Sequence, residues 1–294
     1  MDCLNQGAVT LQHNVKEGPQ DLFVFRVLAS GSSGNAFVLR TDTATLLFEA
    51  GLRLPRLSKY LASEGIATSD LSAVLVSHEH RDHCVGAEEL ASEHGTPVIA
   101  NEQVLRACGL AHLASVDAMP VGQTRRFGDI EVTSFPLEHD AIRHVGFFVR
   151  SQGRTLTIAT DTGKATGDLR DAVSESDLVV IEANHDLHML QTGPYPYHLR
   201  RRVGGPRGHL SNLQAGGIIV KHVKRPDVRV WLAHLSKENN TPLLALRTVR
   251  RVLQGEGMTL NVEVAQRDRP SLRWTGAPRP RQLSLLQHEG SVVA

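Results

Sequence analysis

The 294-residue sequence has few aromatic residues, few cysteines and no long apolar stretch. Aromatic residues make up only 4% of the chain, which argues against a protein that holds nucleic acid on a wide base-stacking platform. The three cysteines, Cys3, Cys84 and Cys108, show no paired framework, which suits a reducing compartment. No apolar run approaches the roughly 18 residues of a membrane span, and the first residues contain no signal-peptide core. The sequence therefore predicts a cytoplasmic protein that does not enter a membrane.

Neither acidic nor basic residues are in large excess over the whole chain, because the formal net charge is only +1. Hydrophobic residues make up 41%, which is enough for a sizeable core. Residues 1–20 are expected to form a disordered leader, and the Pro- and Arg-rich residues 269–294 a flexible tail. Between them, over residues 21–268, strand-like and helical patterns follow one another closely. This order predicts one compact domain of mixed α/β and α+β character, in which helices cover two sheets.

What the sequence does contain is a six-residue cluster of potential metal ligands, His78–His83. The spacing H-x-H-x-D-H supplies ligands for two metal ions from one segment, directly after the apolar run 73–76. Imidazole and carboxylate together suit zinc, manganese or iron. If the strand continues through Ser77, His78 and His80 share one face of it, because strand side chains alternate. A helix that begins near Arg81 would then direct Asp82 and His83 toward a second ion. A solvated, charged loop is the alternative, but this density of ligands favours a metal site.

Three further candidate ligands each follow a strand-like run, and they are His139, Asp161 and His234. Open sheets place their sites at the carboxyl ends of strands, so these side chains are expected to lie near the cluster. For any one of them alone, a hydrogen-bonded surface or core residue would be the simpler interpretation. As a set, they supply the ligands that the cluster lacks.

These motifs resemble those of metallo-β-lactamase-fold hydrolases, whose hallmark is H-x-H-x-D-H followed by a later His, Asp and His. The resemblance covers about residues 22–266 and implies a four-layer αββα sandwich with the metal ions at one edge, between the sheets. It implies that one ion is bound by His78, His80 and His139. It implies that the other is bound by Asp82, His83 and His234, and that Asp161 bridges the two ions together with a water or hydroxide.

One position departs from the family pattern. Glu49 stands where the family usually has an aspartate that supports the metal-binding histidines from behind. Because glutamate is one methylene longer, this support is expected to be shifted or to recruit a water, without abolishing metal binding.

Other strings, among them Ser30–Asn35, Gly208–Asn212 and His234–Asn240, resemble the YycJ/WalJ group, which is associated with 5′-to-3′ DNA exonuclease activity. The order of Glu182, His209 and His234 is also similar to that in ribonuclease Z. There the histidine comparable to His209 is a proposed proton donor, although the long substrate-clamping arm of those enzymes is not evident here. The resemblance thus points to His209 as a general acid, with a locally packed histidine as the alternative. Asp82 could both bind a metal and orient the nucleophile.

Positive charge is concentrated between Arg200 and Arg229, where eight Lys or Arg residues stand against one acid, a local charge of +7. Such a stretch beside the metals would suit a polyanion. We expect Arg200, Arg201 and Arg202 to contact the substrate, although a solvated helix face is the usual outcome of a charge run. Three residues after His234 could bind phosphate or merely cap the helix that begins near Thr241, and these are Lys237, Asn239 and Asn240. His185 and His188 are expected on a surface helix.

The function predicted from these patterns is that of a phosphodiesterase with two divalent ions, Zn²⁺ or Mn²⁺ with Fe also acceptable. The expected activity is 5′-to-3′ exonuclease action on DNA, with attack by a hydroxide shared between the metals. One alternative is a hydrolase of small esters or thioesters of the glyoxalase II or lactonase kind. Others are an RNA nuclease of the tRNA-processing kind and a non-catalytic metal-binding regulator. The sequence leaves the oligomeric state open.

Overall fold

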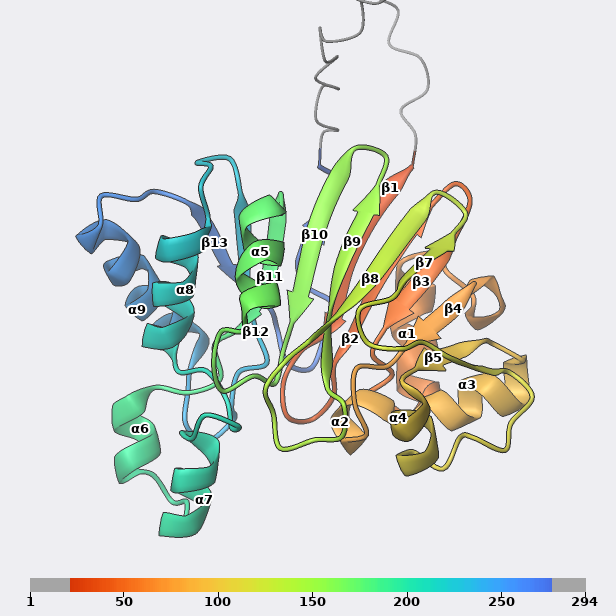
Figure 1. Ribbon diagram of the computed structural model, residues 1–294, viewed down its shortest axis with the longest axis horizontal. Helices are drawn as coiled ribbons and strands as arrows, with labels where there is room; N and C mark the ends of the chain where they lie inside the picture. The colour runs from red at the N-terminus through yellow and green to blue at the C-terminus, as the bar shows by residue number, and fades with distance from the viewer. Residues whose placement is uncertain (1–21, 277–294) are drawn as a thin grey trace, which may run out of the picture.

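A computed structural model describes residues 22–276, in which two seven-stranded sheets pack face to face between two layers of helices (Figure 1). In the first sheet the strands lie in the order β14 (Arg273–Trp274), β1 (Phe23–Ala29), β2 (Ala36–Thr41), β3 (Thr45–Phe48), β4 (Ala73–Leu75), β5 (Val98–Ala100) and β6 (Val116–Ala118). In the second sheet the order is β13 (Asn261–Val264), β12 (Arg229–Ala233), β11 (Leu178–Glu182), β10 (Arg154–Ala159), β9 (Val145–Ser151), β8 (Ile130–Pro136) and β7 (Thr124–Phe127).

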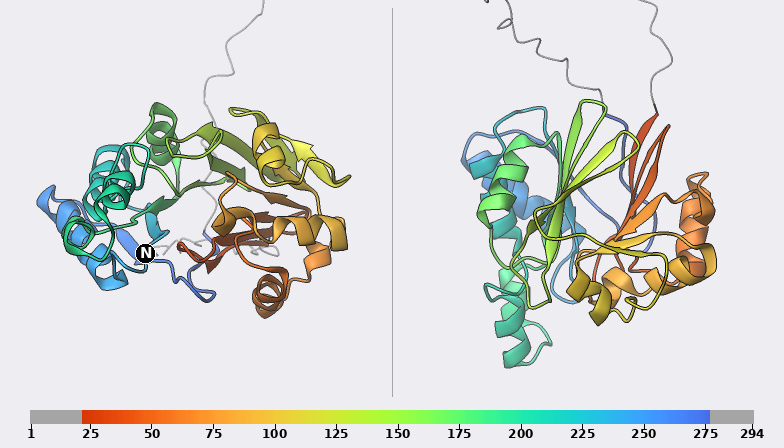
Figure 2. Two further views of the ribbon diagram at one scale, coloured as in Figure 1. Left: turned by 90° about the horizontal axis from the view of Figure 1, so that it is seen from below. Right: turned by 45° about the vertical axis from the view of Figure 1, so that its right-hand side comes forward.

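Helices cover the outer face of each sheet, and Figure 2 shows both groups from below. Beside the first sheet lie α1 (Leu54–Ser63), α3 (Ala87–His94) and α4 (Glu102–Ala107), with a short 3₁₀ turn, η1 (Thr68–Asp70). Beside the second sheet lie α5 (Gly167–Glu175), α8 (Asn212–His222) and α9 (Pro242–Gly255). Three short helices lie toward one edge of the sandwich, namely α2 (Arg81–Cys84), α6 (Leu187–Thr192) and α7 (Tyr197–Val203).

Alternation along the strands creates the layers. In β11, Leu178 and Val180 belong to the core between the two sheets, while Val179 and Ile181 belong to the core under α5, α8 and α9. This period of two is what a strand buried on both faces requires. Between the sheets, the Phe25 ring stacks on the Trp231 indole with centroids 5.6 Å apart. Together with a third core under α1, α3 and α4, this packing gives the expected four-layer αββα sandwich.

The expected strands and helices of the domain all occur, with shifts of a few residues at their ends. The strand before the metal cluster is one exception to the expected geometry, because β4 ends at Leu75 and the chain bends at His78 and Glu79 before α2 begins at Arg81. Helix α6 begins at Leu187, within the surface helix expected around His185 and His188, whereas helix α7 and the edge strands β6 and β7 were not expected. They are short, and their alternation is weak.

The domain extends beyond the expected boundary at residue 268. Strand β14 pairs with β1 through Phe25–Trp274 and Arg26–Arg273, and the Trp274 indole is only 5% exposed. The Phe23 ring packs against it edge to face, with centroids 5.3 Å apart. Residues 269–276 therefore belong to the domain and contribute β14 to the first sheet, instead of starting the tail. Burial of the Trp274 side chain holds this segment in place although the composition around it is Pro- and Arg-rich. The expected leader, 1–20, and the rest of the expected tail, 277–294, lie outside the described residues.

No helix within residues 22–276 combines the length and the apolar character that crossing a membrane would need.

Candidate metal centre

The candidate ligands converge because they follow strands that end at the same edge of the sandwich. Segment 78–83 follows β4, and His139, Asp161 and His234 follow β8, β10 and β12. Strands β10, β11 and β12 are parallel to one another. Strand β8 runs in the same direction as β10, because both β8 and β10 are antiparallel to β9. Their carboxyl ends therefore meet, as the sequence predicted.

Three residues at this edge adopt a left-handed backbone, namely Glu49 (φ 66°), Asp161 (φ 58°) and His234 (φ 53°). This region is uncommon for residues other than glycine and costs free energy unless the surroundings hold it. Each of the three directly follows a strand, or nearly so, and its side chain contacts the other candidate ligands. The left-handed conformation at these three residues thus turns the chain at the end of each strand and directs the polar side chain inward.

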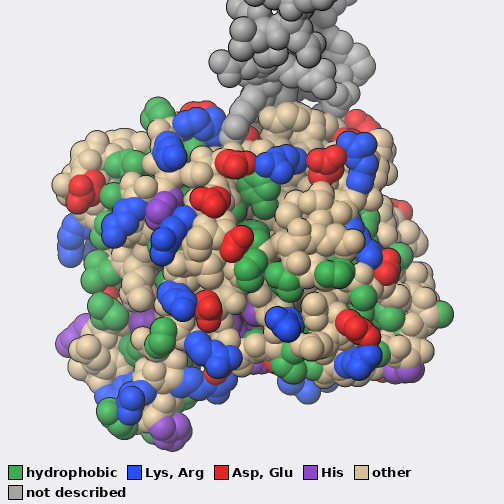
Figure 3. All heavy atoms as spheres, viewed as in Figure 1, with side chains coloured by type: hydrophobic (Ala, Val, Ile, Leu, Met, Phe, Trp, Pro, Cys, Tyr) green, Lys and Arg blue, Asp and Glu red, His purple; other side chains and the backbone are tan. Residues whose placement is uncertain are grey.

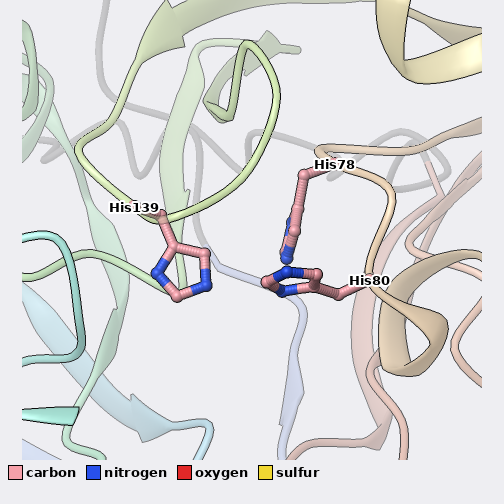
Figure 4. A group of neighbouring side chains, drawn as sticks. All are labelled: His78, His80 and His139. Atoms are coloured by element: carbon pink, nitrogen blue, oxygen red, sulfur yellow. The ribbon is translucent and has the colours of Figure 1, made fainter. Parts of the chain in front are cut away.

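The first ligand group consists of His78, His80 and His139, whose rings face one another in Figure 4. One ligand nitrogen from each lies within 4.8 Å of the others. The opposite nitrogens of two of them are held by the protein. His78 Nδ1 lies 2.9 Å from Ser77 Oγ, and His139 Nδ1 donates to the Gly208 carbonyl at 3.0 Å. Such contacts set which nitrogen is free to bind a metal, and here it is Nε2.

The second ligand group consists of Asp82, His83 and His234, again with donor atoms within 4.8 Å of one another. Asp161 lies between the two groups. Its Oδ2 is 3.0 Å from His83 Nε2, and its Oδ1 is 3.3 Å from His234 Nε2 and 3.8 Å from His139 Nε2. One carboxylate therefore contacts histidines of both groups, which is the position that a bridging ligand would occupy.

Asn35 and Glu49 support the second group from behind. In the buried side chain of Asn35, Nδ2 lies 3.1 Å from His83 Nε2 and Oδ1 lies 3.3 Å from His234 Nδ1. The Glu49 carboxylate is 1% exposed, accepts a hydrogen bond from the Ser77 amide at 3.2 Å and lies 3.4 Å from His83 Nδ1. The longer glutamate side chain is thus accommodated and reaches a ligand histidine directly.

Close backbone packing holds the loops of this region together. A Cβ atom on Gly51 would lie 1.8 Å from the Asp82 carbonyl oxygen, so only glycine fits there. The same carbonyl accepts a hydrogen bond from the backbone N–H of Asn35 at 2.8 Å. The Ser30–Asn35 turn, Gly51 and the start of α2 therefore form one rigid unit behind Asp82.

The electrostatics of the cluster match a set of metal ligands. Burial lowers the pKa of His78 well below its usual range, and an imidazole must be neutral to bind a metal. Burial alone would raise the pKa of Asp161, but His234 and His83 outweigh it and hold the pKa well below the usual value. Burial also disfavours charge on His83, yet the Asp161 and Glu49 carboxylates raise the pKa of this imidazole. The carboxylates that favour a proton on His83 would equally favour a divalent cation, which would have to replace that proton because only the neutral imidazole binds a metal.

The donor set fits divalent metal ions. His78 Nε2 and Asp161 Oδ2 are buried and have no hydrogen-bond partner within residues 22–276. Buried polar atoms are rarely left without a partner, because their desolvation is costly. Both atoms belong to the two groups described above, and imidazole with carboxylate is a donor set for zinc, manganese or iron.

His209 lies beside the ligands but is held differently. Its Nδ1 donates to Glu182 Oε1 at 2.8 Å, and Glu182 is fully buried. The other oxygen of this carboxylate accepts from the Leu210 and Thr162 amides, each at 3.0 Å. Burial alone would lower the pKa of the His209 imidazole, but Glu182 and Asp161 outweigh it and raise the pKa to about 9. His209 is therefore protonated near neutral pH, with Nε2 left to face a ligand.

Five of the seven candidate ligands open, together with His209, onto one cleft of about 220 Å³. Its lining includes His80, Asp82, His139, Asp161, His209 and His234, together with Ser32, Asp140, Gly208 and three residues of α7. Asp140 was missed in the sequence. It lies 3.3 Å from His139 Nε2 and pairs with Arg202, which holds the pKa of the Asp140 carboxyl low although burial opposes this.

The expected substrate-binding residues are only partly placed at the cleft. Arg202 lines it, whereas Arg200 and Arg201 face a second hollow on the other side of α7. Lys237 is exposed but lines neither.

Two of the expected phosphate-binding residues are buried instead. The Asn240 amide donates to the carbonyls of Ala183 and Asn184 and exchanges hydrogen bonds with Asn212. Asn239 is fully buried as well. These contacts leave no face of Asn240 for a substrate, so its role is to join the loops after β11 and β12.

Two histidines differ from their sequence interpretation. His185, which we expected on a surface helix, is 1% exposed, and burial lowers its pKa to about 4. His188, in α6, is exposed as expected. His144 was missed altogether. It is buried with its ring 4.4 Å from that of His78, and its Nε2 donates to the Thr160 carbonyl at 2.8 Å. No spacing pattern marks either residue, because only the packed loops bring them inward.

Known proteins are similar to this chain in amino-acid sequence and in fold. A model of the β-lactamase superfamily domain matches residues 44–222. Exodeoxyribonuclease WalJ of Streptococcus pneumoniae is 34% identical over 247 residues, which are 82% of this chain and 92% of that protein. Exodeoxyribonuclease YycJ of Bacillus anthracis is 35% identical over 241 residues, 79% and 90% of the two chains.

Solved structures agree at the level of the fold. The metallo-β-lactamase-fold protein YhfI of Bacillus subtilis superimposes with a TM-score of 0.66 at 15% identity, over 86% of this chain and 100% of the other. The short form of human tRNase Z gives 0.57 at 17% identity, over 85% and 98%. With its two His- and Asp-rich ligand groups at the edge of an αββα sandwich, this chain belongs to the metallo-β-lactamase superfamily of metal-dependent hydrolases, in the family that contains the WalJ and YycJ proteins.

Proposed function

We propose that this protein is a dinuclear-metal-dependent phosphodiesterase that degrades DNA from the 5′ end, in the cytoplasm. The observation that carries the proposal is the position of Asp161 between two candidate ligand groups, in a cleft that also holds His209 with its Nδ1 bound to the buried Glu182. The exodeoxyribonuclease names of two relatives that align over most of their length support DNA as the substrate. The donor set supports Zn²⁺ or Mn²⁺ as the ions.

The chain's own residues have separable tasks in this reaction. Two bound divalent ions would supply an activated water at neutral pH and stabilise the charge that develops on the phosphate. His209 is positioned to donate a proton from Nε2 to the departing oxygen, since its Nδ1 is held by Glu182. Glu182 fixes the tautomer and the orientation of that ring. Asn35 and Glu49 hold His83 and His234 in place.

The test uses the metal-loaded full chain and DNA labelled separately at its 5′ and 3′ ends. We expect Mn²⁺- or Zn²⁺-dependent release of the 5′ label first, on single- or double-stranded DNA. His80→Ala and Asp161→Ala are expected to abolish the activity, and DNA cleavage that survives in both would indicate a contaminant. RNA and a thioester serve as competing substrates. Rapid thioester hydrolysis that is indifferent to salt, without DNA cleavage, would replace the proposal with the small-molecule hydrolase.

A further inference from the structure

Helices α6 and α7 enclose a second hollow beside the metal cleft. Its volume is about 570 Å³, within the usual range for small-ligand sites. Its walls include Leu187, Leu190 and Gln191 from α6 and Tyr197, Arg200 and Arg201 from α7. In Figure 3, blue basic and green hydrophobic side chains lie next to one another at the lower left, where Figure 1 places these helices.

Helix α7 separates the hollow from the metal cleft. Residues 197, 200 and 201 face the hollow, with Gly204 one turn further on, whereas residues 199, 202 and 203 line the metal cleft. These two sets follow the helical spacing of three and four, so they occupy different faces of one helix. A helix with its side chains is about 10–12 Å across. A polymer that leaves the metal centre therefore has to pass over only one helix to reach the hollow.

The hollow exposes apolar surface of a kind that proteins usually bury. Tyr197 is 67% exposed, the largest value among the exposed large hydrophobic side chains of residues 22–276, and Leu187 is 41% exposed. The Arg201 guanidinium lies over the Tyr197 ring, 5.8 Å from its centroid. An exposed ring with an arginine above it is a surface on which a nucleobase can stack.

The charge of the hollow is one-sided, because no acidic residue lines it. Arg200 donates from Nη1 to the Gln191 carbonyl, which joins α7 to α6, and its Nε has no hydrogen-bond partner within the described part of the chain. Arg202 differs, since it is paired with Asp140 on the metal side. Arg200 and Arg201 thus leave positive charge beside an aromatic ring, which complements a base between phosphates.

We propose that this hollow binds an unpaired nucleobase of the DNA strand whose phosphodiester lies at the metals, with Tyr197 as the stacking ring and Arg200 and Arg201 beside its phosphates. The inference rests on the proposed nuclease function and adds a substrate-binding site to it. It also accounts for a nuclease with so few aromatic residues, because one ring outside the metal cleft is enough to hold a base. A strand without that base should bind about tenfold more weakly, which corresponds to about 1.4 kcal/mol for the stacking of one base.

The test compares two phosphorothioate single strands, one normal and one with abasic residues, by fluorescence anisotropy on the metal-loaded full chain at fixed salt. The wild-type protein is expected to bind the normal strand about tenfold more tightly. Tyr197→Ala is expected to bind both strands equally, and Tyr197→Phe to restore the preference because it keeps the ring. Leu243→Ala, which alters a side chain that is 55% exposed on α9, is the matched control and should keep the wild-type preference.

Two outcomes would overturn the inference, namely equal binding of both strands by the wild type or a preference that persists in Tyr197→Ala. Cleavage of unmodified DNA by the same wild-type preparation separates this inference from the nuclease proposal. If the wild type cleaves DNA but shows no Tyr197-dependent preference, only the base-binding site is wrong. If it shows that preference but does not cleave DNA, the site stands and the nuclease proposal fails.

Discussion

At the scale of single residues, His209 differs from the histidines around it in its partner. The candidate ligand histidines present Nε2 toward Asp161 or toward one another, whereas His209 donates Nδ1 to the fully buried carboxylate of Glu182. A histidine held in this way keeps its proton near neutral pH. We therefore expect His209 to act as an acid rather than as a metal ligand.

Replacement of His209 by alanine should lower turnover without removing metal. General acid catalysis contributes about 10²–10⁴-fold, so we expect kcat on DNA to fall within that range. Metal content, measured by elemental analysis of the purified protein, should stay at the wild-type level, in contrast to His80→Ala. A variant that turns over normally would return His209 to a packing role, and a variant that loses its metal would make it a ligand.

We expect His185 to make the free energy of unfolding depend on pH. Its imidazole is 1% exposed, and burial lowers its pKa from 6.5 to about 4. Between these values the unfolded chain binds a proton that the folded chain does not, so stability rises with pH from about 4 to 6.5 and is level above. The contribution is at most about 3 kcal/mol.

The measurement for His185 is the unfolding midpoint in urea across pH 4 to 7. We expect His185→Gln to show a shallower loss of stability toward low pH than the wild type does. His188→Gln is the matched control, because His188 lies three residues away and is exposed. Parallel pH curves for the wild type and His185→Gln would show that His185 does not titrate in this way.

At the scale of elements, the sequence predicted those whose apolar residues alternate strongly. The buried strands and the amphipathic α1 and α9 follow from hydrophobic spacing alone. Strands β6 and β7 and helix α7 were missed because partly exposed elements carry little such signal. The convergence of the candidate ligands could be predicted because metal chemistry restricts the residue types. The supporting contacts of Asn35 and Glu182 could not be, since they depend on loops that only the fold brings together.

Strand β14 is only two residues long, but we expect it to contribute substantially to the stability of the domain. Trp274 is 5% exposed and packs edge to face on Phe23, and the Gly276 carbonyl accepts a hydrogen bond from Arg154. Loss of a buried tryptophan side chain costs about 3–5 kcal/mol. We therefore expect Trp274→Ala, and a chain that ends at residue 272, to unfold at lower urea concentration. A chain that ends at residue 276 is the matched control for the chain that ends at 272, and equal midpoints for these two chains, together with an unchanged midpoint in Trp274→Ala, would mean that β14 adds nothing to the stability.

At the scale of the whole molecule, the metal centre joins the two sheets. The first sheet leads into His78, His80, Asp82 and His83, and the second into His139, Asp161 and His234. Each ligand group therefore contains residues from both sheets. Ions bound there would connect the halves of the sandwich at one edge, while the core around Phe25 and Trp231 connects them along their length.

Metal removal should therefore lower the thermal stability of the entire domain. A ligand present at about 1,000 times its Kd stabilises the folded state by about 4 kcal/mol, and a domain of this size shifts by about 2–4 °C per kcal/mol. Without ions, His78 Nε2 and Asp161 Oδ2 also have no hydrogen-bond partner within the described residues, so we expect the Tm to fall by about 10 °C or more after dipicolinate treatment. Returning Zn²⁺ or Mn²⁺ should restore it in wild type but not in Asp161→Ala, whereas His112→Ala, altered at an exposed position, should respond like wild type. An unchanged Tm in protein shown to be metal-free would mean that the core alone holds the sheets together and that the ions serve only catalysis.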